Sequence, residues 1–269
     1  MGCTTSYNHK EELPVAELIY NVPRSQKVEQ NQIISENIFN ENGDTLLIHL
    51  IAHKMEGAAL LMLESIETCH IGEIYRDGCT ALSLACNNKM ETVALKLLEY
   101  PEMCNMGNVD KDEGYTALMW ACSNKMETVA LKMLEYPEMC NMGNVDKDNG
   151  YTALILACMN KMENVSLKLL EYPTLCNMGC ATDGGCTALM WACSNKMETV
   201  ALKLLEYPEM CNISKKNRDK LNALDYATDN LMHKVTIQLL KADFYKPRNI
   251  RQNTRCMCFR IAKHILSAV

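Results

Sequence analysis

Apolar and amphipathic segments alternate along the middle of the chain. After Thr116, the residues up to Cys122 are almost all apolar, which predicts a helix of about two turns. The segment 126–136 places apolar side chains at helical spacing and charged side chains on the opposite face, which predicts a second, amphipathic helix. Pro137 is expected to end this helix, because its ring cannot continue the hydrogen-bond ladder. A loop rich in Gly, Asn and Asp follows.

This unit recurs along the chain. Residues 116–141 reappear at 187–212 with a single difference, Met133 against Leu204. Equivalent positions are spaced by 35 or 36 residues and are occupied by Thr45, Thr80, Thr116, Thr152, Thr187 and Asn222. A unit of this length cannot bury its own apolar face, so several units are expected to stack into an all-α solenoid.

The repeated residues resemble the ankyrin repeat family. The family signature T-P-L-H-x-A-A is similar to the segments 80–86, 116–122 and 152–158, and its preceding glycine matches Gly43, Gly78, Gly114, Gly150 and Gly185. The later V-x-x-L-L-E portion of the signature resembles Val93 to Glu99 and Val200 to Glu206. The resemblance spans about 42–242 and implies helix-turn-helix repeats, long finger loops between repeats, and binding of a protein partner.

Domain boundaries follow from the repeat. We expect six units, starting near residues 42, 77, 113, 149, 184 and 219, within an array over 42–243. An N-terminal extension over 1–41 and a basic C-terminal capping helix over 244–269 flank this array. The near-identical copies and the Asn/Lys/Met/Ile-rich usage resemble the ankyrin-repeat proteins of giant DNA viruses of amoebae.

The repeats depart from the family pattern in three features. Alanine replaces the proline that opens the first helix, and the unit is two to three residues longer than the family's, with the excess in the loop. Lysine replaces the glycine between the helices, at Lys89, Lys125, Lys161 and Lys196. A left-handed conformation there is unfavourable for a residue other than glycine, so we expect the preceding asparagine to adopt it.

The candidate partner-binding residues follow each Thr-Ala-Leu. This position varies while its neighbours stay constant, and we expect it on the inner, concave side of the first helices, at Ser83, Met119, Ile155 and Met190. Partial burial under the loops is the alternative. One residue later, Trp120 and Trp191 occupy a position that other units fill with leucine, so they are expected to pack in the core.

The sequence gives little indication of a metal site, a cofactor site or a catalytic site. Of 15 cysteines, eight sit in repeat register and are expected to be buried small apolar residues of a reducing cytosol: Cys86, Cys104, Cys122, Cys140, Cys158, Cys176, Cys193 and Cys211. Zinc at Cys256 and Cys258 would need two more ligands, and only His264 is near. No catalytic triad pattern or phosphate loop recurs. We therefore expect no enzyme, no metal and no cofactor.

Charge is distributed unevenly. The net charge is −6, while residues 244–269 carry six basic and no acidic side chains. An acidic body argues against nucleic acid as a partner. Alternating carboxylates at Asp110, Asp112 and Glu113, and at Asp146 and Asp148, resemble a calcium loop but lack its twelfth-position Glu, so a solvated loop is expected.

The N-terminus offers a possible membrane tether. No apolar run approaches the roughly 20 residues that span a bilayer, and the start lacks a signal peptide pattern. Gly2 and Ser6 fit the N-myristoylation pattern, and Cys3 is a candidate for palmitoylation. An ordinary, unmodified start is the alternative. The basic tail is either a capping helix or a second membrane contact.

These observations favour a non-catalytic protein-binding module. We expect a monomeric adaptor or decoy that engages a host protein in the host cytosol through its concave face and finger loops. The alternative is a scaffold anchored to the cytoplasmic face of a membrane through acylated Gly2 and Cys3.

Overall fold

The computed structural model describes residues 45–64, 69–75 and 77–244. The chain divides into two compact units, Met1–Asn141 (unit 1) and Met142–Val269 (unit 2). The described residues form twelve α-helices, joined by turns, 3₁₀ segments and isolated β-bridges, with no β-strand among them. The expected all-α repeat fold is therefore confirmed.

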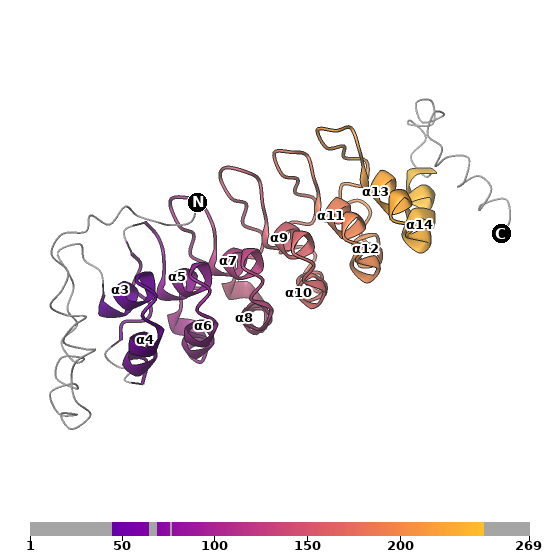
Figure 1. Ribbon diagram of the computed structural model, residues 1–269. Helices are drawn as coiled ribbons and strands as arrows, with labels where there is room; N and C mark the ends of the chain where they lie inside the picture. Colours follow the sequence, from indigo (N-terminus) through magenta and orange to yellow (C-terminus); the bar gives the residue numbers. More distant parts are fainter. Residues whose placement is uncertain (1–44, 65–68, 76, 245–269) are drawn as a thin grey trace, which may run out of the picture. The chain divides into compact units, whose positions relative to one another are not determined.

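Unit 1 contains three helix pairs. Each pair has a first helix and an antiparallel second helix, and successive pairs stack side by side (Figure 1). The pairs are α3 (Leu46–Ala52) with α4 (Glu56–Met62), α5 (Ala81–Asn87) with α6 (Glu91–Leu97), and α7 (Ala117–Ser123) with α8 (Glu127–Met133).

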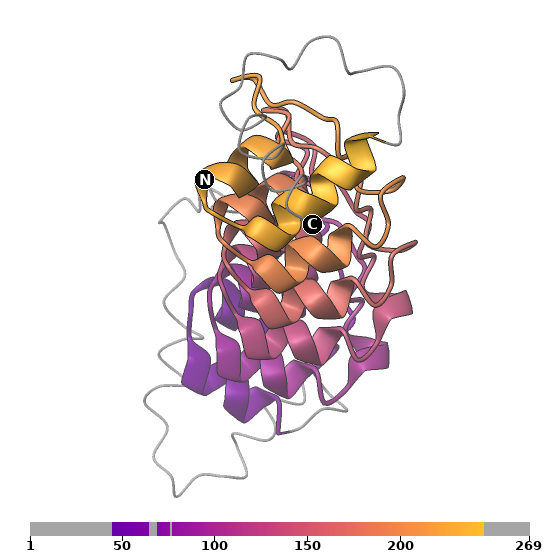
Figure 2. The same ribbon diagram turned by 90° about the vertical axis from the view of Figure 1, so that its right-hand side faces the viewer.

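Unit 2 repeats this arrangement. The pairs are α9 (Ala153–Met159) with α10 (Glu163–Leu169), α11 (Ala188–Ser194) with α12 (Glu198–Leu204), and α13 (Ala223–Asp229) with the longer α14 (His233–Phe244). In unit 2, α11 packs against both α9 and α13, so the first helices form one row and the second helices another (Figure 2). No helix among the described residues is both long and apolar enough to cross a membrane.

The repeated threonine begins each first helix. Its hydroxyl oxygen accepts a hydrogen bond from the backbone N–H three residues later, at 3.2 Å for Thr116 and 3.3 Å for Thr187. In the sixth repeat, Asn222 caps α13 with its side-chain oxygen in the same way. Such caps satisfy N–H groups that the helix leaves unpaired, and replacing one by alanine costs about 1 kcal/mol. The threonine therefore recurs because every first helix needs a cap.

The second helices end earlier than Pro137 and its equivalents predict. α8 ends at Met133, and the next residues turn, with the Tyr136 N–H bonded to the Met133 oxygen at 2.9 Å. Pro137 instead opens a 3₁₀ turn, η3 (Pro137–Met139), just as Pro101 opens η2 (Pro101–Met103). The position suits proline, because the first residue of a helical turn needs no N–H donor.

The left-handed residue between the helices is lysine, so the expectation that asparagine adopts it was wrong. Lys125 has φ +60° and Lys196 has φ +60°. Asn124 keeps φ −91°, and its side-chain nitrogen donates to the Cys86 oxygen, at the end of the preceding first helix, at 2.9 Å. Because the asparagine amide must reach that helix, the strained conformation falls on the next residue, at about 1 kcal/mol.

A row of asparagines joins neighbouring repeats in this way. In unit 1, Asn88 donates to the Ile51 oxygen at 2.9 Å. In unit 2, Asn195 donates to the Cys158 oxygen at 2.9 Å and Asn230 to the Cys193 oxygen at 3.1 Å. Each of these carbonyls lies near the end of a first helix and also accepts a backbone N–H, for example that of Lys196 at the Cys193 oxygen at 3.3 Å. The asparagine therefore adds a second hydrogen bond, which links the two repeats.

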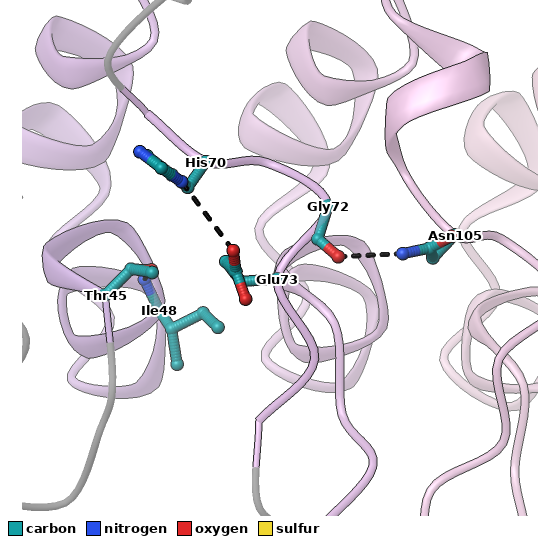
Figure 3. A network of polar contacts seen from close by, with 6 residues as sticks. All are labelled: Thr45, Ile48, His70, Gly72, Glu73 and Asn105. Atoms are coloured by element: carbon teal, nitrogen blue, oxygen red, sulfur yellow. Dashed lines mark hydrogen bonds and ion pairs between the residues drawn. The ribbon is translucent and has the colours of Figure 1, made fainter.

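A second row of asparagines joins the bases of the loops. In unit 1, the Asn105 side chain donates to the Gly72 oxygen at 2.7 Å, beside an exposed pair of His70 and Glu73 (Figure 3). In unit 2, Asn212 makes the same contact with the Gly179 oxygen at 3.1 Å. The approach is close enough that a Cβ on Gly179 would lie 2.6 Å from the Met210 oxygen, which explains the glycine.

The cysteines in repeat register are buried, as predicted. The Cys104 thiol donates to the Leu97 oxygen at 3.0 Å and the Cys140 thiol to the Met133 oxygen at 3.1 Å. Burial raises the pKa of both thiols to about 12, so they stay protonated at neutral pH. They act as small core side chains with a weak donor.

Candidate partner-binding surface

The four residues predicted to face a partner lie in the interior. The exposed fractions are 3% for Ser83, 0% for Met119, 1% for Ile155 and 2% for Met190. The expected accessible position is therefore wrong, because these side chains occupy the third position of a first helix that is enclosed almost completely. In α7, every residue from Ala117 to Cys122 is buried.

Ser83 has a structural role instead. The Thr80 N–H donates to the Ser83 hydroxyl at 2.8 Å, and the Ser83 N–H donates to the Thr80 hydroxyl at 3.1 Å. This reciprocal pair is a capping box at the start of α5. At Met119, Ile155 and Met190 the backbone N–H alone serves the threonine cap, while the side chain fills core space.

The finger loops carry most of the accessible polar side chains near the first helices. We define them as residues 70–75, 77–79 and 105–115 in unit 1, and 142–151, 177–186 and 212–221 in unit 2. They extend to one side of the helices within each unit (Figure 1). A backbone bond closes each loop before the helix begins; for example, the Asp110 N–H donates to the Tyr115 oxygen at 3.0 Å and the Asn217 N–H to the Leu221 oxygen at 2.9 Å.

Asp110 is the centre of its finger loop. Its carboxylate accepts the N–H groups of Glu113 at 2.7 Å, Gly114 at 3.0 Å and Tyr115 at 3.1 Å. A fourth donor is the indole Nε1 of Trp120, at 3.1 Å. Trp120 also contacts the Tyr115 ring, with centroids 4.7 Å apart. Asp110 thus fixes both the loop and the tryptophan.

The expectation of solvated loop carboxylates was therefore wrong for two residues. Asp110 is 1% exposed and Asp146 is 5% exposed. Asp146 accepts the N–H groups of Asn149, at 3.1 Å, and of Tyr151. A carboxylate that binds several backbone donors is well satisfied without a metal ion. Asp148 is exposed, as expected.

The sixth repeat holds its loop with an amide. The Asn217 side-chain oxygen accepts the Leu221 N–H at 2.9 Å, and its nitrogen bonds to the Tyr226 hydroxyl at 2.9 Å. Tyr226 occupies the same position in α13 as Trp120 does in α7, four residues after the cap. Two repeats therefore tie this aromatic position to the loop through a side chain.

Trp191 in α11 lacks such a tie. It is less buried than Trp120, and its Nε1 is shielded from solvent while no described residue accepts a hydrogen bond from it. Its finger loop is one residue shorter and carries Ala181 and Thr182 in place of the carboxylate. The Thr182 hydroxyl serves the loop, accepting the Cys186 N–H at 3.1 Å.

Comparison with known proteins decides the family. A model described as ankyrin repeats (three copies) matches the chain over residues 47–141, 94–178 and 136–219. The chain belongs to the ankyrin repeat family. Proteins with these repeats are typically interaction modules without catalytic activity, which identifies this chain as a protein-protein interaction module at that general level. No curated protein matches it in a sequence search.

Two solved structures have a similar fold. A chain in the complex of the predatory endopeptidase Bd0816 from Bdellovibrio bacteriovorus with immunity protein Bd3460 is 18% identical, with a TM-score of 0.52, over 74% of this chain and 98% of that chain. The ankyrin repeat domain of Bcl-3, a member of the IkappaB family, is 21% identical, with a TM-score of 0.52, over 81% of this chain and 96% of that domain.

Finger-loop charge separates one ankyrin repeat from the others. Loop 105–115 carries three acidic side chains and one lysine, and loops 142–151 and 177–186 also carry more acidic than basic residues. Loop 212–221 carries a single acidic residue, Asp219, and four basic ones: Lys215, Lys216, Arg218 and Lys220. The basic cluster of loop 212–221 is visible in the sequence, but the negative net charge of the whole chain conceals it.

Two predicted features lie outside the described residues. They are the acylation site at Gly2 and Cys3 and the basic segment 245–269, including Cys256 and Cys258. Both stay predictions.

Proposed function

We propose that the protein is a non-catalytic adaptor or decoy that binds another protein through its finger loops. The observation that carries the proposal is the division between interior and surface. The first helices bury the position that varies among repeats, for example Ser83 in α5 and Met119 in α7, whereas the loops expose charged residues and the apolar side chains of Ile74 (52%) and Val145 (39%).

The loops are also held in place before any partner arrives. The base of each loop is closed by a backbone hydrogen bond. In three loops Asp110, Asp146 or Asn217 also binds backbone N–H groups, and asparagine side chains join the bases of neighbouring loops within each unit. A surface that is already ordered loses less conformational entropy on binding. This supports a binding role for loops that would otherwise be costly to order.

The partner we propose is a host protein in the host cytosol, which this chain would bind as a monomer. This follows the resemblance to the ankyrin-repeat proteins of giant DNA viruses, and we propose no nucleic-acid target. No enzyme activity or cofactor is part of the proposal.

The test is capture of a partner by loop variants. The loop variant replaces exposed residues of unit 2 with serine at Asp148, Asp183, Lys216 and Arg218. The matched control replaces Lys132 and Lys203, which lie at the ends of second helices with side-chain exposures of 40% and 36%, with alanine. We expect wild type and control to cross-link the same protein from host cytosol and the loop variant to lose it. Equal recovery of the protein by the loop variant would show that the loops are not part of the interface. If wild type cross-linked no specific protein, the proposed function would be wrong.

A membrane-tethered scaffold is the second candidate. It is favoured by the sequence Met-Gly-Cys-Thr-Thr-Ser at the start of the chain and by the basic segment 245–269. One myristoyl chain binds membranes only marginally, so Cys3 or the basic segment would supply the second signal. Metabolic labelling with a myristate analogue tests it: we expect label on wild type and none on Gly2→Ala. Label that survives Gly2→Ala, or absent label on wild type, would rule out the tether.

A further inference from the structure

We propose that the last finger loop of unit 2, together with Trp191 of α11, binds an acidic segment of a protein partner. The basic side chains of loop 212–221 would neutralise the segment, and Trp191 would donate its indole hydrogen to one of its carboxylates. This inference rests on the proposed function, because it names the chemistry of the partner that the loops bind.

The loop concentrates unpaired positive charge. Lys215, Lys216, Arg218 and Lys220 are all exposed, and none forms an ion pair with a described residue. By contrast, the lysines at the ends of α6, α8, α10 and α12 are each paired with a glutamate three residues on, for example Lys203 with Glu206 at 2.7 Å. Cations this close repel one another within the screening length of about 10 Å at ordinary salt. An anionic partner relieves this repulsion.

The charges are presented from a fixed base. Asn217, at the root of the loop, is 8% exposed and is bonded to both Leu221 and Tyr226. On the other side, the Arg218 N–H donates to the Gly184 oxygen of the neighbouring loop at 2.9 Å. The loop therefore holds its cations beside unit 2 without first having to become ordered.

Trp191 belongs to α11, the first helix of the repeat that precedes the basic loop. α11 packs against α13, and Trp191 has the same position in α11 as Tyr226 has in α13. Tyr226 is tied to the loop through Asn217, whereas the Trp191 Nε1 has no acceptor among the described residues. A buried donor without an acceptor is unfavourable. Turning Trp191 toward a partner carboxylate would break no existing side-chain bond, but the same movement of Trp120 would break its bond with Asp110.

A protein segment suits this surface better than a nucleic acid or a membrane. Both of those present negative charge over an extended surface. The loop bases of unit 2 are joined in a row, since the Asp183 N–H donates to the Asn149 oxygen at 2.8 Å and Arg218 bonds to Gly184. Exposed carboxylates of Asp148 and Asp183 along that row would repel an extended polyanion. A short acidic segment contacts the basic loop alone.

The test measures binding of a fluorescein-labelled peptide of alternating glutamate and glycine by anisotropy. The test variant is Lys216→Glu with Arg218→Glu. The control is Lys89→Glu with Lys125→Glu, which changes the net charge equally at exposed positions of unit 1. We expect the test variant to bind at least about tenfold more weakly and the control to stay within about twofold of wild type. All four positions are exposed, so circular dichroism melting should confirm that both variants fold.

Trp191 is tested by its fluorescence. The chain has two tryptophans, so Trp120→Phe leaves Trp191 as the only reporter. We expect the peptide to shift its emission, and the emission of Trp120 in Trp191→Phe to stay unchanged. Absence of binding, equal weakening in test variant and control, no response of Trp191, or stronger binding of a single-stranded oligonucleotide or a phosphatidylserine vesicle would each overturn the inference. If the cross-linking experiment still showed that the loops are needed to capture a protein, the proposed function would hold even though this inference had failed.

Discussion

Residues 116–141 in unit 1 and 187–212 in unit 2 are copies that differ at one position, yet their tryptophans have different surroundings. Both copies begin with a threonine cap and end with an asparagine contact, at Asn141 to Gly107 and Asn212 to Gly179. Trp120 is bonded to Asp110, whereas Trp191 has no acceptor among the described residues. The difference comes from the preceding loops, which are not copies of each other.

This comparison separates scaffold from surface within one repeat protein. The helices repeat the caps, the buried thiols and the asparagine bonds that stacking requires. The loops determine whether the nearby aromatic side chain has a hydrogen-bond partner. They also set the charge of the residues around it. The same tryptophan therefore serves as a core residue in one repeat and as a candidate contact in another.

The largest effect should follow from Asp110→Ala. This change leaves three backbone N–H groups and the Trp120 indole without their acceptor in a buried position, so we expect a loss of about 3 kcal/mol in the free energy of unfolding. Urea denaturation followed by circular dichroism measures it. Asp148→Ala, at an exposed position, is the control and should change stability by less than about 0.5 kcal/mol. Similar losses from both changes would contradict the role given to Asp110.

Where the two copies make the same contact with the loop before them, substitutions at that contact should cost the same. A Cβ would lie 2.7 Å from the Met139 oxygen at Gly107 and 2.6 Å from the Met210 oxygen at Gly179. We expect Gly107→Ala and Gly179→Ala each to destabilise by about 2 kcal/mol. Gly57→Ala is the control, because Gly57 is an exposed helical residue with nothing within 4 Å of its added Cβ, and it should stabilise by up to about 1 kcal/mol. Unequal costs at Gly107 and Gly179 would show that the copies differ in their scaffold as well.

Where the copies differ, the two tryptophans should respond differently. Trp120→Phe removes a hydrogen bond, while Trp191→Phe removes a donor that has no described acceptor. We expect Trp120→Phe to destabilise the protein by about 1.5 kcal/mol more than Trp191→Phe, measured by the same denaturation. A larger loss at Trp191 would mean that its indole has a partner in the free protein.

The smallest effect should come from the left-handed lysines. Lys125→Gly and Lys196→Gly relieve the same strain, at φ +60° in each copy, and should each stabilise by about 0.5 to 1 kcal/mol. Asn124→Gly is the counter-test: it removes the amide bonds to the preceding helix and should destabilise. If Asn124→Gly instead stabilised the protein, asparagine and not lysine would be the left-handed residue.

The scaffold was predictable because each of its features recurs. The period, the helix pairs, the buried cysteines and the core position of Trp120 all follow from residues that repeat. Prediction failed where a position varies but is enclosed. Ser83, Met119, Ile155 and Met190 differ among repeats, which favours a surface position, yet each fits the same buried site at the start of a helix.

Contacts between residues far apart in the sequence also could not be predicted from local sequence patterns. The sequence around Lys125 indicates a left-handed turn but does not show that Asn124 must reach a carbonyl 38 residues earlier. Likewise, the acidic loop pattern suggested solvent exposure, because the four donors around Asp110 are gathered only when the loop closes. The spacing of Asp110 and Trp120 was a usable signal, since the near-copy at Trp191 lacks the carboxylate.

The most direct test records the two indole N–H signals by ¹H–¹⁵N NMR while the alternating glutamate–glycine peptide is added. Asp110→Asn should move one signal, which assigns it to Trp120, and should leave the other in place. We predict that the peptide moves the Trp191 signal and leaves the Trp120 signal unchanged. A shift of Trp120 alone, or of neither signal, would contradict the account.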